Sequence, residues 1–480
     1  MYVEKFAIAK YVLPVLLFLG SCQNKPINDE QIEKPNIVIV IADDLGWADV
    51  GYNGAELYET PNIDKLAADG MVFTRFYPGA ANCAPSRACL LTGMYTPRHH
   101  VYIPQGLARG GDVSKMRWKV PTQGEDSSFN TFKVSINTVD PEFESLAEML
   151  KRSGYTSARL GKWHIGDDNQ GFDAVSAAGV MGEITNYNGT EKRYYSDTLV
   201  AEKLTDAALD FMEENKNKPF FLYLAHWEVH TALAARQTRI NYYQEKLNQS
   251  GNTDLDPVYA AEIEQVDVSL GRIVNRLKEL NLEKNTIVIF TSDNGGITGI
   301  TSNLPLRGGK GTFYEGGIRV PFCIKWPGVT NPGSQTNIPV IGVDFMPTFA
   351  EIASAQLPRD QPVDGVSFLP LLRGEQLEQE RSFFFHFPLY LGTGRDRVLP
   401  AWDGQENYWR AVPSTTIISG DWKLINYYEY DRYELFNLKD DISEQHDLSS
   451  TKPEIANKLL DELNRWTDDV QAPIPSVAND

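Results

Sequence analysis

The sequence has few cysteines and no repeated unit. Only four of its 480 residues are cysteine, which argues against a fold held together by many disulfides. The lack of a fixed-period repeat argues against solenoids and propellers. Basic residues are outnumbered, with 45 Lys and Arg against 64 Asp and Glu, and the formal net charge is −19. We therefore expect no nucleic-acid partner, because phosphate binding requires a basic surface.

The marked apolar run near the N-terminus is too short to span a bilayer comfortably. It covers residues 11–19, follows two lysines and ends in Leu19-Gly-Ser-Cys22. Residues 1–22 thus resemble a bacterial lipoprotein signal peptide, with cleavage before a cysteine that is then lipidated. The alternative is an ordinary signal peptide with an incidental cysteine. Residues 23–34 are polar and suit a tether, so we expect an exported lipoprotein, in the periplasm or at the outer membrane, whose membrane contact is the lipid on Cys22.

Three apolar, β-branched runs indicate strands that are buried on both faces. They cover residues 36–41, 219–224 and 286–290. Helical patterns lie between them, and the one over 257–280 places its apolar residues on a single stripe. Alternating strands and helices predict an α/β fold with a large, mostly parallel sheet flanked by helices, in a domain that covers 35–375.

The pattern of the sequence changes after about Arg373. Short strand-like runs alternate with turn residues between 382 and 437. An amphipathic pattern over 453–470 predicts a closing helix. We expect residues 376–480 to form a smaller C-terminal α+β subdomain of antiparallel strands and a terminal helix, packed beside the main domain.

Polar side chains follow two of the predicted strands. Asp43 and Asp44 come after the first strand, and Asp293 and Asn294 after the third. Sites in parallel sheets form outside the carboxyl ends of the strands. Neighbouring carboxylates repel unless a cation lies between them, and oxygen ligands favour a hard cation. We expect these four residues to bind Ca²⁺, with Mg²⁺ as the less favoured ion.

The segment Cys83-Ala-Pro-Ser-Arg87, followed by Leu91-Thr-Gly93, resembles the maturation motif of the type I sulfatase family, within the alkaline-phosphatase-like superfamily. The resemblance implies that a formylglycine-generating enzyme converts Cys83 to Cα-formylglycine, which is both nucleophile and metal ligand. The residue chemistry agrees, since a hard cation suits an oxygen nucleophile better than a soft thiolate. The alternative is a structural cysteine in a turn. Cys89 and Cys323 then remain as a pair or as two buried thiols.

Three further segments resemble elements of the same family. They are Gly161-Lys-Trp-His164, His230-Thr-Ala232 and Gly309-Lys-Gly-Thr-Phe-Tyr-Glu-Gly-Gly317. Ala232 departs from the pattern, because the family commonly has proline at this place. The resemblance extends from about Asn36 to Trp326 and more loosely to the C-terminal helix.

The resemblance assigns roles to the charged residues of these segments. Arg87, Lys162 and Lys310 would surround a sulfate group. His230 would protonate the departing oxygen, and His164 would accept a proton when sulfate is released. The implied function is hydrolysis of sulfate esters on a sulfated polysaccharide or its oligosaccharides, either algal, such as ulvan or carrageenan, or a glycosaminoglycan.

Two other functions fit parts of the pattern. A phosphonate or phosphate ester hydrolase of the same superfamily would use the same nucleophile, although a dianionic ester would favour a second metal. A non-catalytic glycan-binding lipoprotein would be expected to have lost catalytic positions, and none is missing. The candidates for sugar contacts, each with packing as the alternative, are His99, His100, His226, Trp227, Glu228, Arg236 and Arg307.

Overall fold

The computed structural model describes residues 34–103, 115–119, 138–166, 168–175, 200–251, 255–377, 380–392, 399 and 408–477. The predicted signal peptide with Cys22, and the tether up to residue 33, lie outside these ranges. Residues 34–480 form one compact unit. Within the described ranges, no helix is both long and apolar enough to cross a membrane.

The largest element is an eight-stranded, mostly parallel sheet, which confirms the predicted architecture. Its central strands, in spatial order, are β8 (Thr286–Ser292), β1 (Asn36–Ala42), β7 (Phe220–Ala225) and β5 (Thr156–Gly161). These four strands are parallel. Every residue of β1, β7 and β8 is buried, which explains why their sequences are continuous apolar runs rather than alternating ones.

Shorter strands extend the sheet on both sides. They are β10 (Ser334–Thr336), β2 (Met71–Phe73) and β9 (Phe322–Lys325) beside β8, and β6 (Ala174–Val175) beside β5. Strand β9 runs antiparallel to both of its neighbours. A separate pair, β3 (Phe76–Tyr77) with β11 (Val340–Ile341), is parallel.

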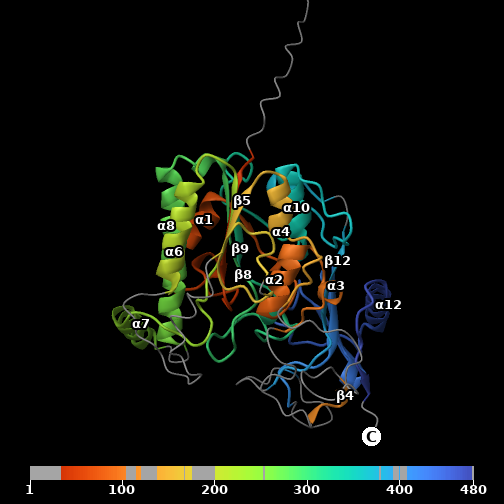
Figure 1. The fold of residues 1–480 in the computed structure, drawn as a ribbon. Coiled ribbons are helices and arrows are strands. Elements are labelled where there is room, and N and C mark those ends of the chain that lie inside the picture. Colours follow the sequence, from red (N-terminus) through yellow and green to blue (C-terminus); the bar gives the residue numbers. More distant parts are fainter. Residues whose placement is uncertain are drawn as a thin grey trace, which may run out of the picture. The chain divides into compact units, whose positions relative to one another are not determined.

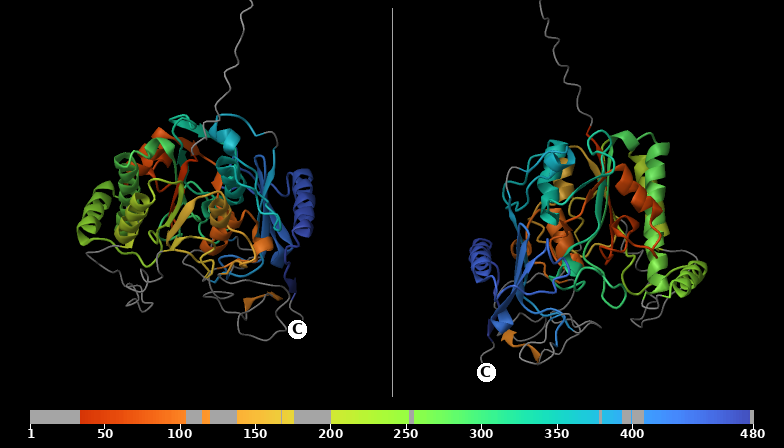
Figure 2. Two further views of the ribbon diagram at one scale, coloured as in Figure 1. Left: turned by 45° about the horizontal axis from the view of Figure 1, so that its top comes forward. Right: turned by 180° about the vertical axis from the view of Figure 1, so that it is seen from behind.

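Helices cover both faces of the large sheet (Figure 1). One face packs against α1 (Pro61–Asp69), α6 (Val200–Glu214) and α8 (Pro257–Glu279), with α7 (Gln237–Ser250) packed on α8. The other face packs against α2 (Cys83–Thr92), α4 (Leu146–Arg152), α10 (Phe345–Ala353) and α11 (Leu369–Leu372). The same two layers are seen from behind in Figure 2.

Short helices link these elements. They are η1 (Gly51–Asn53), α3 (Thr96–His99), η4 (Glu283–Asn285), α9 (Glu315–Ile318), η5 (Gly342–Asp344) and η6 (Tyr428–Tyr430). Capping side chains start two of the longer helices. Ser145 and Glu148 form a capping box on α4, and Asp256 accepts a hydrogen bond from Val258 N at the start of α8.

The C-terminal part contains the predicted antiparallel sheet and terminal helix. Its strands are β12 (Ser382–Phe387), β13 (Ser414–Ser419), β14 (Trp422–Tyr427) and β15 (Arg432–Asn437), in sequence order. Gly420, at a φ of +60°, makes the two-residue turn between β13 and β14. Helix α12 (Pro453–Asp469) covers one face of this sheet. Beyond it, β16 (Ser476–Val477) pairs antiparallel with β4 (Trp118–Lys119), a contact that the sequence does not predict.

Candidate active site

Four neighbouring parallel strands end at one edge of the sheet, and each is followed by candidate residues. These are Asp43 and Asp44 after β1, Asp293 and Asn294 after β8, His226 after β7, and Lys162 after β5. The register aligns Ala42 with Ser292, and Gly161 with Ala225. The residues that follow are therefore brought to the same height at the sheet edge, as expected for a parallel sheet.

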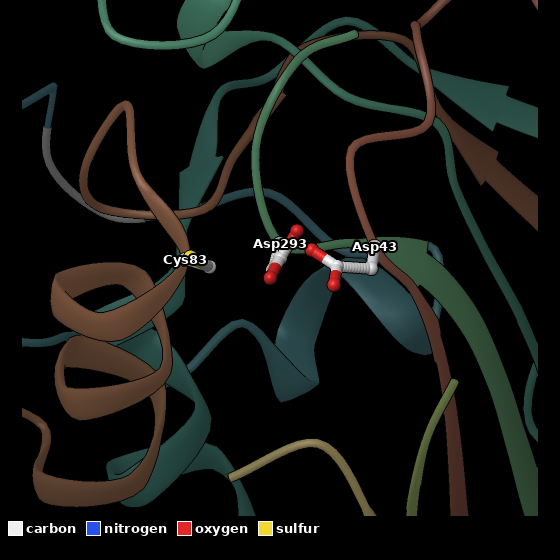
Figure 3. A group of neighbouring side chains, drawn as sticks. All are labelled: Asp43, Cys83 and Asp293. Carbon is white, nitrogen blue, oxygen red and sulfur yellow. The ribbon is translucent and has the colours of Figure 1, made fainter. Parts of the chain in front are cut away.

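Cys83 lies at the same edge of the sheet. It is the first residue of α2, one of the helices that cover one face of the sheet (Figure 3). Candidate ligand atoms of Asp43, Cys83 and Asp293 all lie within 4.8 Å of one another, and the three residues are buried. The positive end of the dipole of α2 points toward the same place, which favours a negatively charged group there. The structure thus gathers the predicted nucleophile and the predicted metal ligands into one cluster.

Two buried oxygens of the cluster test whether a cation fits. Within the described part of the chain, Asp43 Oδ1 and Asn294 Oδ1 have no hydrogen-bond partner. The amide nitrogen of Asn294 donates to Asp44 Oδ1 at 2.7 Å, which fixes the orientation of the amide group. A buried polar atom without a partner costs about 1–3 kcal/mol. Oxygens of this kind match the ligands of a hard divalent cation.

Each carboxylate of the cluster also contacts a basic side chain. Lys162 Nζ contacts Asp43 Oδ2, and Lys310 Nζ lies 2.6 and 2.7 Å from the two carboxylate oxygens of Asp44. The guanidinium of Arg87 donates twice to Asp293 Oδ2, at 3.0 and 2.6 Å, and once to the carbonyl oxygen of Lys162 at 2.8 Å. The three predicted sulfate-binding cations are therefore gathered around the predicted metal ligands.

The acidic groups have opposite pKa shifts. Burial raises the pKa of Asp43 to about 8, against the effect of Lys162 and with a contribution from the nearby carboxylate of Asp293. Burial acts on Asp44 in the same direction, but Lys310, His230 and Lys162 together outweigh it and hold the pKa of Asp44 below its usual range. Mutual repulsion of this kind is relieved when a cation binds between the carboxylates.

The two predicted proton-transfer histidines lie at the rim of this cluster. His230 Nε2 is 3.6 Å from Asp44 Oδ2, and the ring of His164 packs edge-on against Trp227 at 5.8 Å. Burial, together with the charge of Lys162, lowers the pKa of both imidazoles. Both rings are therefore neutral near pH 7. His164 has a φ of +66°, a backbone conformation that is uncommon for residues other than glycine and that often occurs at functional sites.

The structure does not bring every candidate sugar-contact residue to the cluster. Trp227 is half-buried and lies 5.5 Å from Lys162 Nζ, so it borders the site. His226 is fully buried, and its Nε2 lies 3.0 Å from Ser269 Oγ, which fits the alternative of a buried polar contact. His99 is 1% exposed and pairs with Cys89 at 3.4 Å. A side chain held in the core in this way is not available to a sugar.

The remaining candidates mostly contact protein groups. Arg307 stacks on the ring of Tyr314 at 4.0 Å and donates to the carbonyl oxygen of Glu444 at 2.8 Å. Glu228 is 6% exposed and accepts a hydrogen bond from Ala201 N at 2.9 Å. The other two are Arg236, which pairs with Glu202, and His100, which is half-buried at the C-terminal end of α3.

Two buried charged residues of the C-terminal part, Lys423 and Glu444, are not predicted from the sequence. Both side chains are fully buried, and Lys423 Nζ lies 2.8 Å from Glu444 Oε1. A signal for Lys423 is present in the sequence. Lys423 lies on the same side of β14 as Ile425 and Tyr427, which face the core. A lysine therefore occupies an inward-facing position of the strand.

Comparisons with known proteins show the family of the chain. The model of the family described as "Sulfatase" matches residues 35–355, and that of "N-sulphoglucosamine sulphohydrolase, C-terminal" matches 309–469. A relative named "Sulfatase" from Formosa agariphila is 30% identical, over 96% of this chain and 94% of its own. The N-acetylgalactosamine-6-sulfatase of Mus musculus is 31% identical, over 74% and 69% of the two chains.

Solved structures share the fold. The structure of Ps i-CgsB in complex with k-i-k-neocarrahexaose has a TM-score of 0.71 and is 28% identical, over 92% of this chain and 94% of the other. A phosphonate monoester hydrolase of Agrobacterium radiobacter has a TM-score of 0.66 at 18% identity, over 93% and 100% of the two chains, and shows the fold alone. The family match, the relatives and the arrangement of the site lead to one conclusion: the chain belongs to the sulfatase family of sulfuric ester hydrolases.

Proposed function

We propose that the chain hydrolyses sulfate esters of a sulfated polysaccharide or its oligosaccharides, with Cα-formylglycine made from Cys83 as the nucleophile and one Ca²⁺ beside it. The observation that carries the proposal is the convergence of Cys83, the carboxylates after β1 and β8, and three basic side chains at one sheet edge, of which Arg87 and Lys162 are buried and Lys310 is mostly buried. Sulfated sugars are the proposed substrates because the solved structure at 28% identity holds a neocarrahexaose. Glycosaminoglycans and other algal glycans, such as ulvan, remain in the proposed range.

Asp43, Asp44, Asp293 and Asn294 would hold the cation, and an oxygen at position 83 in place of the thiol would complete a set of hard ligands. The cation would stabilise negative charge on the sulfate group and on the nucleophilic oxygen. Hydrated formylglycine would supply that oxygen and a second hydroxyl through which sulfate can be released.

The basic residues would bind and orient the sulfate group. Lys162 and Lys310 already lie against the carboxylates of the cluster, where an anion beside the cation would meet both ammonium groups. Arg87 holds Asp293 and the carbonyl oxygen of Lys162 with one guanidinium group. It therefore fixes a metal ligand and the lysine backbone in relation to α2. Preorganised charges of this kind stabilise a transition state without reorganisation during the reaction.

The neutral histidines would move the protons. His164 has a lowered pKa, so it is free to accept a proton from the nucleophile. His230 lies beside Asp44 at the partly exposed rim, where the departing oxygen of the sugar would leave. Burial is the main cause of the lowered pKa of His230, and the charges of Lys162 and Lys310 add to it. A bound anion would offset those two charges and raise the pKa of the imidazole, which favours its role as the proton donor to that oxygen.

A second candidate function is hydrolysis of phosphate or phosphonate esters, which is favoured by the fold that the chain shares with a phosphonate monoester hydrolase. Matched aryl sulfate and aryl phosphate esters separate the two functions. We expect a higher kcat/KM for the sulfate ester, because three cations and one divalent ion suit a singly charged ester. A preference for the phosphate ester would reject the proposal. If the protein hydrolyses neither of these esters and no sulfated sugar, the result would favour a glycan-binding lipoprotein.

We also propose that the chain is exported and anchored through a lipid on Cys22, which would place the site among glycans of the periplasm or outer membrane. Growth of the host with a labelled fatty acid tests this directly. We expect label on the wild-type chain and none on Cys22→Ala. Equal labelling of both chains would reject the anchor.

A further inference from the structure

The loop that carries Lys310, residues 307–317, is closed on itself and tied to the active site. Gly316 N donates to Arg307 O at 2.8 Å, which joins the two ends of the loop. A Cβ on Gly317 would lie 2.1 Å from Thr312 O, so the closed form requires glycine there. The backbone at Lys310 contacts the segment after β8 and the segment before α2. Lys310 N donates to Gly296 O at 3.0 Å, and Gly311 N donates to Ala81 O at 2.8 Å.

Glu444, from the C-terminal part of the chain, holds both ends of this loop. Its carboxylate accepts a hydrogen bond from Glu315 N at 2.7 Å. Its backbone carbonyl accepts one from Arg307 Nη1 at 2.8 Å. Glu444 follows β15 and has a φ of +50°, so a residue in an uncommon backbone conformation makes both contacts.

Lys423 supplies the charge that lets two glutamates lie side by side without solvent. Its Nζ is 3.1 Å from Glu315 Oε1 and 2.8 Å from Glu444 Oε1, and all three side chains are fully buried. Glu315 is also held by Tyr77 Oη at 3.1 Å and by Arg319 at 3.3 Å. Burial raises the pKa of Glu444 to about 7, whereas Lys423 and Arg319 outweigh burial and lower that of Glu315.

A buried ion pair of this kind is a poor way to gain stability. Apolar residues of the same volume are often as stabilising or more so, because the desolvation of two charges is costly. Its directional contacts instead fix one geometry. For a catalytic group, a misplacement of about 1 Å can cost roughly 10²-fold in rate.

We propose that Lys423 and Glu444 are positioning residues: through Glu315 and Arg307 they hold the 307–317 loop so that Lys310 Nζ stays beside Asp44. The C-terminal sheet thereby takes part in building the sulfate site, although neither residue touches it. The catalytic consequence rests on the proposed function, in which Lys310 binds the sulfate group. The structural part, that the pair holds the loop, does not.

The test compares the double variant Lys423→Met/Glu444→Gln with Asp267→Asn. The double variant removes one charge of each sign, so Glu315 keeps Arg319, and the new amide can still accept a hydrogen bond from Glu315 N. Asp267 is a matched buried control. Its carboxylate accepts two backbone hydrogen bonds at the start of α1, from Asn62 N and Ile63 N, both at 2.8 Å. Glu444→Gln alone is the milder variant if the double variant does not fold.

Two measurements are made on each protein: hydrogen–deuterium exchange of peptides that cover 307–317, and kinetics with an aryl sulfate. For the double variant we expect at least tenfold faster exchange in these peptides. We also expect kcat/KM to fall by about 10–100-fold, with weaker inhibition by inorganic sulfate. Lys423→Arg, which keeps the charge, should recover much of the activity. Asp267→Asn should lose thermal stability without either change.

Unchanged exchange in the 307–317 peptides would overturn the proposal, whatever the enzyme hydrolyses. Faster exchange with kcat/KM within twofold of wild type would overturn the positioning role. An inactive wild-type enzyme that carries formylglycine would reject the proposed function instead, and the exchange rates would still decide whether the pair holds the loop.

Discussion

Arg87→Met tests how strongly the site depends on one buried cation. Arg87 and Asp293 have side chains that are each 1% exposed, and the guanidinium makes three hydrogen bonds inside the cluster. Methionine fills a similar volume but makes none of them. The substitution leaves Asp293 buried without its cation and leaves the carbonyl oxygen of Lys162 without its guanidinium donor.

Breaking a buried ion pair by removing one partner costs about 3–5 kcal/mol. The entropy of unfolding is about 2.1 cal/mol/K per residue, which gives ~1 kcal/mol/K for a chain of 480 residues. The melting temperature of Arg87→Met should therefore fall by about 3–5 °C. Sulfatase activity should fall as well, since the same guanidinium holds a metal ligand.

The assay is a thermal melt at one scan rate, with Arg272→Met as the control. Arg272 pairs with Asp206 at 2.5 Å, but the two side chains are 39% and 62% exposed. An exposed pair contributes about 0–1 kcal/mol, so the control should shift the melting temperature by about 1 °C or less. Equal small shifts in both variants would refute the view that the Arg87 pair is a main support of the site.

Three further predictions follow from the same structure. Removal of divalent cations with EDTA should lower the melting temperature, and Ca²⁺ should restore it better than Mg²⁺. A ligand at 100 times its Kd stabilises the fold by about 2.7 kcal/mol. A melting temperature that neither ion changes would contradict the proposed metal site. Burial raises the pKa of Glu429 from 4.5 to about 7. Its protonated form therefore stabilises the fold fully below pH 4.5, and this contribution is lost as the pH rises through about 7. Glu429→Gln should thus be the more stable protein at pH 8 and should gain little at pH 5, as urea unfolding at the two pH values would show; an equal effect at both would contradict the shift. His99→Ala should lower the melting temperature through lost packing and leave KM for a sulfated sugar unchanged, whereas a raised KM would return His99 to the substrate site.

Much of the architecture can be predicted from the sequence because the central strands carry their own signal. A strand that is buried on both faces needs a continuous apolar run, and the acidic residues after two such runs indicate where the strands end. The sequence contains no comparable signal for the spatial order of the strands, β8-β1-β7-β5. That order depends on how crossover helices return to the sheet, and it is this order that places Lys162 next to the metal ligands.

Several contacts cannot be predicted from the sequence, for physical reasons. The sequence near His99 does not reveal that its ring faces Cys89 in the core, because a polar residue beside a motif is equally compatible with a surface position. The pairing of β4 with β16 joins two-residue strands that are far apart in the sequence, too short for a periodic pattern. The contacts of Glu444 depend on its own left-handed backbone conformation in a loop. The local composition does not indicate that conformation.

The mass of the peptide that contains Cys83, purified from the native host, tests the central claim most directly. We predict that the peptide carries formylglycine, with a mass lower than that of the cysteine form by the difference between the two residues. Sulfate release should rise in proportion to the converted fraction across preparations, and Cys83→Ala should bind substrate without turnover. Full sulfatase activity in protein whose Cys83 is entirely unmodified would contradict the account.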